Sequence, residues 1–321
     1  MNKCLSCYEP LTDGQDYHPK CSMAFFGTTE PPHIDHTLAD MDALAQQVVE
    51  RSISVPGVQA KLSMSVVRAQ LQGQHVADQR LTVVGALDGS YILKPPSSHY
   101  PELPANAHLT MRIAAAFKLP VVPACMIRLK SGELAYLTKR IDRKPDGTKL
   151  HMLDMFQVLE ASQKYMGSME KVGKALGTYS AQPLLDKLYL FELTLFSFLT
   201  GNNDMHLKNF SMLRDAGGWV LAPAYDLLNV SIVLPADEEE LALTLAGKRS
   251  KFKREHFEDY GRGLGLNAKQ IAGAFRRMWA GKDKALDWIA RSFLSPEMQA
   301  RYTALLHDRY ARLYPSADAA Q

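Results

Sequence analysis

The sequence predicts an α+β fold of two lobes, with a β-rich lobe near residues 28–140 and a mostly helical lobe near 141–321. A small Cys/His flap at residues 1–27 precedes them and holds three of the four cysteines. Short apolar runs separated by turn-forming residues fill 52–140, a pattern typical of antiparallel strands. Beyond residue 147, apolar side chains recur at helical spacing. A β-rich half followed by a helical half favours two lobes.

Local signals predict each element of the β-rich half. Asp40 is a candidate cap for the first helix. Asp88-Gly89 predicts a hairpin between the runs on either side of it, and Ser131-Gly132 predicts another. The predicted elements are helices at 40–51 and 109–117, strands at 63–67, 81–86 and 91–94, and a hairpin of 121–129 with 133–140.

The helical half is predicted to contain helices at 151–164, 168–177, 182–200, 253–262, 267–280, 283–292 and 296–314. Its most apolar stretch, 188–200, is interrupted by Glu192, and only nine uncharged residues follow before Asn202. About 18 would be needed to span a bilayer. The formal charge of +3 is too small to imply a nucleic-acid partner by itself. Four cysteines and a polar opening segment favour a cytoplasmic protein.

The segment TGNNDMHLKNF at 200–210 carries the clearest chemical signal. Asp204 and Asn209 stand in the D-x-x-x-x-N spacing of a kinase catalytic loop. Phosphoryl transfer needs a carboxylate that faces the attacking hydroxyl and an amide oxygen that reaches a phosphate-bound metal. Asp226 follows the strand-like run 219–221, where a second Mg²⁺-binding carboxylate is needed. The alternative is a turn with Asx hydrogen bonds, with Asp226 as a helix cap.

A small-residue loop, SISVPGVQAKLS at 52–63, precedes a predicted strand. The backbone N–H groups of such a loop can approach phosphate oxygens, although one glycine is a weak signal. Lys94 stands at the end of a strand about 33 residues later. A strand-borne lysine after a phosphate-covering loop is how kinases hold the α- and β-phosphates. A solvated lysine on an edge strand is the alternative.

Six motifs together resemble the HipA-like serine/threonine kinase toxins: GNNDMHLKNFS, PAYDLL, VPGVQAKLS, YILKP, HLTMRIA and LTKRIDR. The resemblance covers most of residues 20–315, and the chain length and SIS-VPG loop are most similar to the short HipT-type branch. The resemblance implies a bilobal protein-kinase-like fold. It also implies ATP- and Mg²⁺-dependent phosphorylation of protein serine or threonine.

The resemblance assigns roles at matching positions. Asp204 would orient the acceptor hydroxyl, and His206 and Lys208 lie beside it in the catalytic loop. Asn209 and Asp226 would hold Mg²⁺. The nucleotide would be contacted by Asn209 and by the loop, strand and hinge residues Val58, Gln59, Lys61, Lys94, Lys139 and Ile141.

Two further features concern regulation and a departure from the family pattern. Ser52 and Ser54 match loop positions where such kinases phosphorylate themselves, and phosphate there would disfavour ATP binding. The alternative is that both serines only satisfy turn backbone groups. Many relatives have Asn-Glu where this chain has Asn106-Ala107. The partner of Lys94 therefore stays open, with Glu102 as a candidate.

The family resemblance also implies partners. The chain would be the toxin of a type II toxin–antitoxin system, with a translation component as target and aminoacyl-tRNA synthetases as the leading class. A helix-turn-helix, HipB-like antitoxin would neutralise it and would provide its only, indirect, contact with DNA. A small HipS-like protein is a second candidate partner. Two alternatives remain: a small-molecule kinase, because D-x-x-x-x-N does not encode the acceptor, and a co-repressor that works with a DNA-binding antitoxin.

The N-terminal flap carries the pattern C-x2-C-x10-H-x2-C, formed by Cys4, Cys7, His18 and Cys21. Three thiolates and an imidazole suit tetrahedral Zn²⁺, so these are candidate zinc ligands. The alternative is a set of reduced, partly buried cysteines with His18 hydrogen-bonded. Cys125 stands alone on a predicted strand and is expected in the core.

Overall fold

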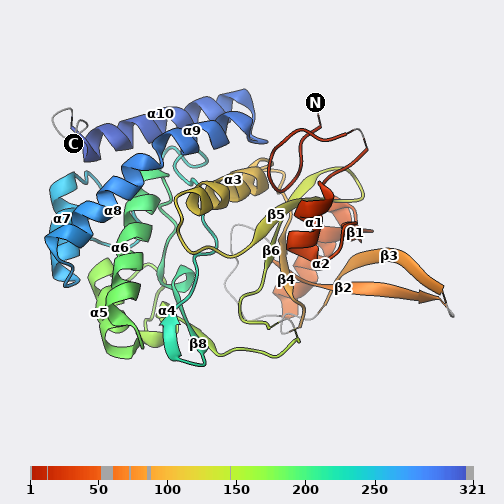
Figure 1. Ribbon diagram of the computed structural model, residues 1–321, viewed down its shortest axis with the longest axis horizontal. Coiled ribbons are helices and arrows are strands. Elements are labelled where there is room, and N and C mark those ends of the chain that lie inside the picture. Colours follow the sequence, from red (N-terminus) through yellow and green to blue (C-terminus); the bar gives the residue numbers. More distant parts are fainter. Residues whose placement is uncertain are drawn as a thin grey trace. The chain divides into compact units, whose positions relative to one another are not determined.

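The computed structural model describes residues 2–12, 14–51, 61–71, 74–84, 88–144 and 146–315 (Figure 1). The chain divides into two compact units. Unit 1 comprises Met1–His108 and Val122–Gly147, and unit 2 comprises Leu109–Val121 and Thr148–Gln321. The segment Leu109–Val121 thus groups with the helical unit, although it lies within the range predicted for the β-rich lobe.

The described strands of unit 1 form one sheet in the order β1-β3-β2-β4-β6-β5. All neighbours are antiparallel except β1 and β3. The strands are β1 (His33–Ile34), β2 (Leu62–Leu71), β3 (Gln74–Val83), β4 (Tyr91–Lys94), β5 (Ala124–Arg128) and β6 (Leu134–Lys139). The β5–β6 hairpin around Ser131-Gly132 confirms the prediction.

The hairpin predicted at Asp88-Gly89 is wrong. The turn is present, with Gly89 at φ +82°, but β2 lies between β3 and β4 and pairs with both. The two strands joined by this turn, β3 and β4, are therefore not paired with each other, because β2 separates them in the sheet. Gly89 is required there because a Cβ atom would lie 2.5 Å from the Met64 carbonyl oxygen. A local turn signal identifies the turn but does not show which strands pair.

The helices of unit 1 are α1 (Pro19–Phe26), α2 (Leu38–Arg51) and the first part of α3 (Leu103–Ala116). The predicted N-cap of α2, Asp40, is wrong by three residues, because the cap is Thr37. Thr37 Oγ1 accepts from the Asp40 N–H at 3.2 Å, and the Asp40 carboxylate accepts from the Thr37 N–H at 2.7 Å. This reciprocal pair makes Asp40 the third residue of a capping box, with Thr37 as its cap.

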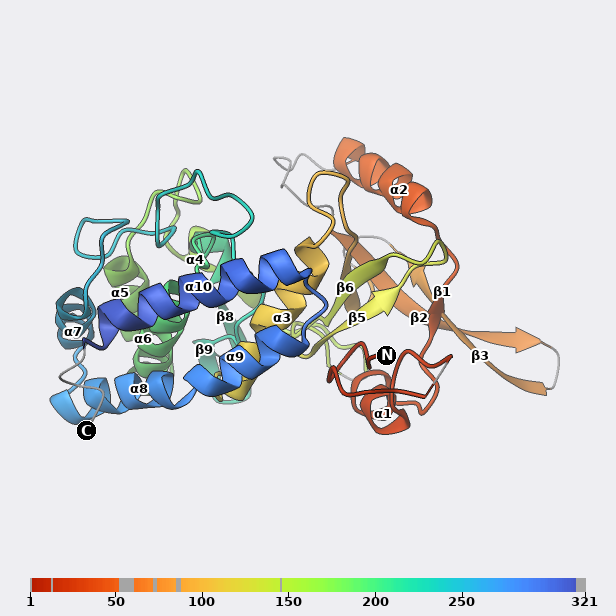
Figure 2. The same cartoon turned by 90° about the horizontal axis from the view of Figure 1, so that it is seen from above.

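Unit 2 is mostly helical, as predicted. Its helices are the second part of α3, α4 (Met155–Val158), α5 (Met169–Tyr179), α6 (Pro183–Leu199), α7 (Arg254–Gly263), α8 (Ala268–Ala280), α9 (Lys282–Arg291) and α10 (Pro296–Leu313). α6 is apolar nearly all round and packs against α5, α7, α8 and α10 (Figure 2). The strongly apolar stretch at 188–200 is therefore a core helix. Among the described residues, no helix is both long and apolar enough to cross a membrane.

The helix predicted at 151–164 is mostly wrong. Met152–Asp154 forms strand β7, and only the short α4 follows it. β7 pairs with β8 (Ser211–Asp215), which pairs with β9 (Gly218–Leu221). The Asp154 carboxylate then accepts from the Gln157 N–H at 2.8 Å and starts α4. Pairing with β8, more than 50 residues away, overrides the local helical pattern.

Candidate active site

The loop that carries the predicted catalytic residues begins directly after the buried helix α6. Gly201 turns the chain with φ +66°, and a Cβ atom there would lie 2.7 Å from Asn229 Oδ1. The Gly201 carbonyl accepts from the N–H groups of Val230 and Ser231. Downstream, the His206 N–H donates to the Asp204 carbonyl at 2.8 Å. Backbone hydrogen bonds therefore hold the start of the loop, and the side chains of Asn203 and Asn209 add further hydrogen bonds.

Asp204 is the exposed carboxylate of this loop, with 38% of its side chain accessible. Its Oδ1 accepts a hydrogen bond from the Tyr165 hydroxyl at 2.6 Å. His206 Nε2 lies 3.9 Å from the same oxygen, which is too far for a hydrogen bond. With Oδ1 engaged, Oδ2 is the carboxylate oxygen that could accept a further hydrogen bond. Tyr165 was missed by sequence analysis because nothing in its local pattern links it to a residue 39 positions away.

His206 is buried beside Asp204, with its ring packed edge-on against Tyr165 at a centroid distance of 5.1 Å. Burial lowers the pKa of His206, and the carboxylates of Asp204 and Asp226 oppose this only in part. The imidazole is therefore neutral at pH 7, which suits a positioning group rather than a cation. Lys208, the other predicted catalytic neighbour, lies with Nζ 4.8 Å from the centroid of the Phe156 ring.

Asn209 ends the short 3₁₀ turn η1 (Leu207–Asn209) and is buried. Its Nδ2 donates to the Asp204 carbonyl at 2.8 Å, which ties the two ends of the D-x-x-x-x-N segment together. Because Nδ2 is engaged, Oδ1 is the atom that could bind a cation.

Asp226 follows β9 and has φ +60°, a left-handed conformation that is strained for a residue with a side chain. Strain of this kind costs on the order of 1–3 kcal/mol and tends to occur at functional sites. The preceding Tyr225 anchors the turn, because its hydroxyl hydrogen-bonds with Ser211 Oγ at 2.5 Å and with the Lys208 carbonyl at 3.1 Å. Asp226 is thereby tied to the catalytic loop, and it acts on the pKa of His206. An amide oxygen and a carboxylate are hard oxygen ligands of the kind that Mg²⁺ prefers.

The predicted nucleotide residues of unit 1 lie on the central strands of its sheet and beside them. Lys94 ends β4, is 5% exposed, and lies opposite Tyr136 with Nζ 5.7 Å from that ring's centroid. Lys94 is thus a buried lysine and not a solvated edge residue. Lys61 is exposed just before β2. Ser52, Ser54, Val58 and Gln59 lie outside the described residues.

Lys139 and Ile141 stand where β6 ends. The Lys139 N–H donates to the Pro123 carbonyl at 3.0 Å, and the Arg140 N–H donates to the Ser90 carbonyl at 2.9 Å. Burial lowers the pKa of Lys139, whose Nζ lies 5.4 Å from the Phe25 ring centroid. The Lys139 carbonyl also accepts a hydrogen bond from the Thr138 hydroxyl at 3.4 Å.

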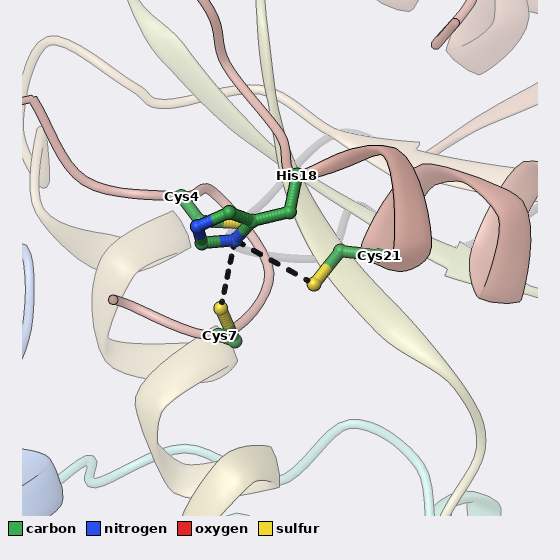
Figure 3. A group of neighbouring side chains, drawn as sticks. All are labelled: Cys4, Cys7, His18 and Cys21. Carbon is green, nitrogen blue, oxygen red and sulfur yellow. Dashed lines mark hydrogen bonds between the residues drawn. The ribbon is translucent and has the colours of Figure 1, made fainter. Parts of the chain in front are cut away.

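The four flap residues predicted as zinc ligands are also brought together. The ligand atoms of Cys4, Cys7, His18 and Cys21 all lie within 4.8 Å of one another (Figure 3). Cys125, in contrast, is fully buried on β5, as expected for a core residue.

Comparison with known proteins identifies the family to which this chain belongs. Residues 53–286 match the model of the HipA-like C-terminal domain. A Haemophilus influenzae protein named as an inferred kinase is 26% identical over 306 residues, which cover 84% of this chain and 81% of that protein. The serine/threonine-protein kinase toxin HipA of Shewanella oneidensis is 27% identical over 214 residues, 60% of this chain. The chain spans only 46% of that toxin.

Solved structures show the fold. HipA of Shewanella oneidensis, solved with HipB and operator DNA, matches with a TM-score of 0.67 at 22% identity and covers 84% of this chain and 70% of its own. The Helicobacter pylori proinflammatory kinase CtkA matches with a TM-score of 0.54 at 16% identity and covers 73% of this chain and 87% of its own. These matches confirm the predicted α+β, protein-kinase-like fold. Since the family model matches more than half of the sequence, the chain belongs to the HipA-like C-terminal domain family.

Proposed function

We propose that this chain is an ATP- and Mg²⁺-dependent serine/threonine protein kinase. The observation that carries the proposal is the Asp204–Asn209 loop, in which an exposed carboxylate and a buried amide are joined by the Asn209–Asp204 hydrogen bond. The strained Asp226 lies beside that loop. Membership in the HipA-like family and the kinase names of its relatives support the same reading.

In this proposal, Asp204 Oδ2 accepts the proton of the acceptor hydroxyl. The hydroxyl oxygen bonds to the γ-phosphorus, the bond from that phosphorus to the bridging oxygen breaks, and ADP leaves. Tyr165 holds Oδ1 and so fixes the direction of Oδ2. Asn209 Oδ1 and the Asp226 carboxylate would hold Mg²⁺, which supplies positive charge beside the phosphate oxygens when bound.

Unit 1 would supply nucleotide contacts. Lys94 is a buried lysine on a central strand, which suits a contact with the α- and β-phosphates. The Lys139 carbonyl and the Ile141 N–H would meet the donor and acceptor on the adenine edge. Lys61 and the loop before it, including Val58 and Gln59, would cover the phosphates. The partner of Lys94 in the active state stays a prediction, with Glu102 as the candidate.

We further propose that the chain acts as a type II toxin whose partner is a HipB-like antitoxin. The support is the Shewanella relative, which is named as a toxin and was solved with HipB and operator DNA. A translation component, with aminoacyl-tRNA synthetases as the leading class, is the proposed target. Contact with DNA would be indirect, through the antitoxin. The short HipT-type branch and a HipS-like partner stay predictions from the sequence.

The experiment compares three proteins: wild type, Asp204→Asn and Asp287→Asn. Asp287 is an exposed acid on α9 and serves as the matched control. Each is incubated with γ-labelled ATP and a total protein extract, with Mg²⁺ or with a chelator. We expect label on extract proteins with wild type and Asp287→Asn, and a loss of about 10²-fold or more with Asp204→Asn or without Mg²⁺.

Equal labelling by wild type and Asp204→Asn would refute the assignment of the catalytic loop. Label on small molecules alone would favour the small-molecule kinase. Nucleotide binding without any transfer would favour a co-repressor. Mass spectrometry of the same samples tests autophosphorylation, which should place phosphate on Ser52 or Ser54 in the active proteins and not in Asp204→Asn.

A further inference from the structure

The N-terminal flap contains a cluster of metal-binding side chains that the proposed kinase chemistry does not use. Cys4 and Cys7 come from one turn, His18 precedes α1, and Cys21 lies in the first turn of α1. Their three sulfur atoms and one imidazole nitrogen converge from these two segments toward one point (Figure 3). Cys4 is buried, and the other three are partly exposed.

The spacing of these atoms fits a tetrahedral metal site. A zinc–sulfur bond of about 2.3 Å gives a tetrahedron with edges of about 3.8 Å. His18 Nδ1 lies 3.5 Å from Cys7 Sγ and 4.0 Å from Cys21 Sγ, and no pair of ligand atoms is more than 4.8 Å apart. A disulfide would require two sulfurs at about 2.05 Å, whereas all four described cysteines are free thiols.

The surroundings of His18 select the tautomer that a metal needs. Nε2 lies 3.0 Å from the Pro10 carbonyl oxygen, which can only accept, so the ring proton belongs on Nε2. The lone pair of Nδ1 then points toward the sulfurs. A carbonyl that receives the far N–H of a histidine is the usual outer partner of a metal-bound imidazole.

The turn that carries the first two cysteines is held in place independently. The Cys4 N–H donates to the Glu9 carbonyl at 2.9 Å, and the Tyr8 N–H donates to the Cys4 carbonyl at 3.0 Å. Tyr8 has φ +64°, a strained value, and its buried hydroxyl hydrogen-bonds with His108 Nδ1 at 2.9 Å. The ligands are thus pre-positioned by the fold.

We propose that Cys4, Cys7, His18 and Cys21 bind one structural Zn²⁺. Four protein ligands complete the tetrahedron, and no position is left for a substrate or a catalytic water. The site joins the two segments of the flap where the flap contacts the sheet of unit 1. There the Met126 N–H donates to the Leu5 carbonyl at 2.9 Å, and the Tyr17 hydroxyl donates to the Met126 carbonyl. By joining the two segments of the flap, Zn²⁺ would therefore stabilise the packing of the flap against β5.

The test uses the purified full chain and elemental analysis. We expect about one zinc per chain in the wild type and in Cys125→Ala, which removes the cysteine outside the cluster. The double variant Cys7→Ser/Cys21→Ser should contain less than about a tenth as much zinc. Zinc that persists in the double variant, or wild-type protein that contains none and takes up none from added Zn²⁺, would overturn the proposal.

Measurements on unmutated protein keep the test decisive even if the double variant does not fold. Co²⁺ exchanged into the wild type should give the visible absorption of a tetrahedral thiolate site, whereas an octahedral spectrum would contradict the ligand set. Chelation should speed proteolytic cleavage within residues 2–26 by about ten-fold or more, because the metal contributes folding free energy. Unchanged cleavage, or a mass lower by two hydrogens that signals a disulfide, would contradict a structural clamp. None of these readouts depends on kinase activity.

Discussion

Replacing Glu240 with glutamine should destabilise unit 2 strongly. The Glu240 side chain is only 10% exposed and accepts hydrogen bonds from Arg312 at 2.6 and 3.0 Å and from the Phe252 N–H at 3.0 Å. Its Oε1 also forms an ion pair with Arg309 Nη1 at 2.8 Å. Arg309 is itself buried. The glutamine amide would keep one acceptor oxygen but would remove the buried counter-charge of the two arginines, and among the described residues only the exposed Asp308, 3.9 Å from Arg312, would remain.

Removing one partner of a buried ion pair typically costs about 3–5 kcal/mol. The amide oxygen that remains places this substitution near the lower end, at roughly 3 kcal/mol in the free energy of unfolding. At roughly 2–4 °C per kcal/mol for a domain of this size, Tm should fall by roughly 6–12 °C. Glu239→Gln is the matched control. Glu239 is the adjacent residue and pairs with Arg249, but its side chain is 43% exposed, so its loss should cost less than about 1 kcal/mol.

The assay is urea unfolding of the nucleotide-free protein, repeated across pH. Burial raises the pKa of Glu240, but the hydrogen bonds from Arg312 and Phe252 and the charge of Arg309 outweigh this and hold the pKa below its ordinary value of 4.5. The stabilisation is therefore complete above pH 4.5 and is lost as the pH falls through the lowered pKa. The difference in the free energy of unfolding between wild type and Glu240→Gln should become smaller in that pH range. If Glu240→Gln and Glu239→Gln lowered the free energy of unfolding equally at pH 7, the reasoning would be refuted.

Two further substitutions test the site and the sheet. Tyr165→Phe removes the hydrogen bond to Asp204 and should lower kcat by about 10-fold with little change in the KM for ATP, whereas Tyr179→Phe, at an exposed position on α5, should change neither. A lost ATP affinity would instead assign Tyr165 to nucleotide binding. In urea unfolding, Gly89→Ala should lower the free energy of unfolding by at least about 1 kcal/mol more than Gly132→Ala does. Both glycines have positive φ, but only at Gly89 does the added Cβ meet the Met64 carbonyl, and equal costs would show that the strand relaxes.

The sequence alone was sufficient for elements whose signals are local. The helices α5 to α10 were predicted close to their observed bounds, because each buries one face or, for α6 beyond its exposed first turn, most of its surface at helical spacing. Motif spacing also predicted that Asp204 and Asn209 lie in one loop, where they are joined by a hydrogen bond, whereas the catalytic and metal-binding roles of Asp204, Asn209 and Asp226 stay predictions. The C-x2-C and H-x2-C spacings likewise predicted a ligand cluster.

Tertiary structure decided whatever depends on residues far apart in the chain. Met152–Asp154 forms a strand because its backbone pairs with β8. The turn at Asp88-Gly89 predicted a hairpin, but β2 lies between β3 and β4 in the sheet. Tyr165 reaches Asp204 across 39 residues. The Pro10 carbonyl sets the tautomer of His18. Periodicity and spacing record the constraints within one segment, whereas pairing partners and hydrogen-bond directions arise only when separate segments pack together.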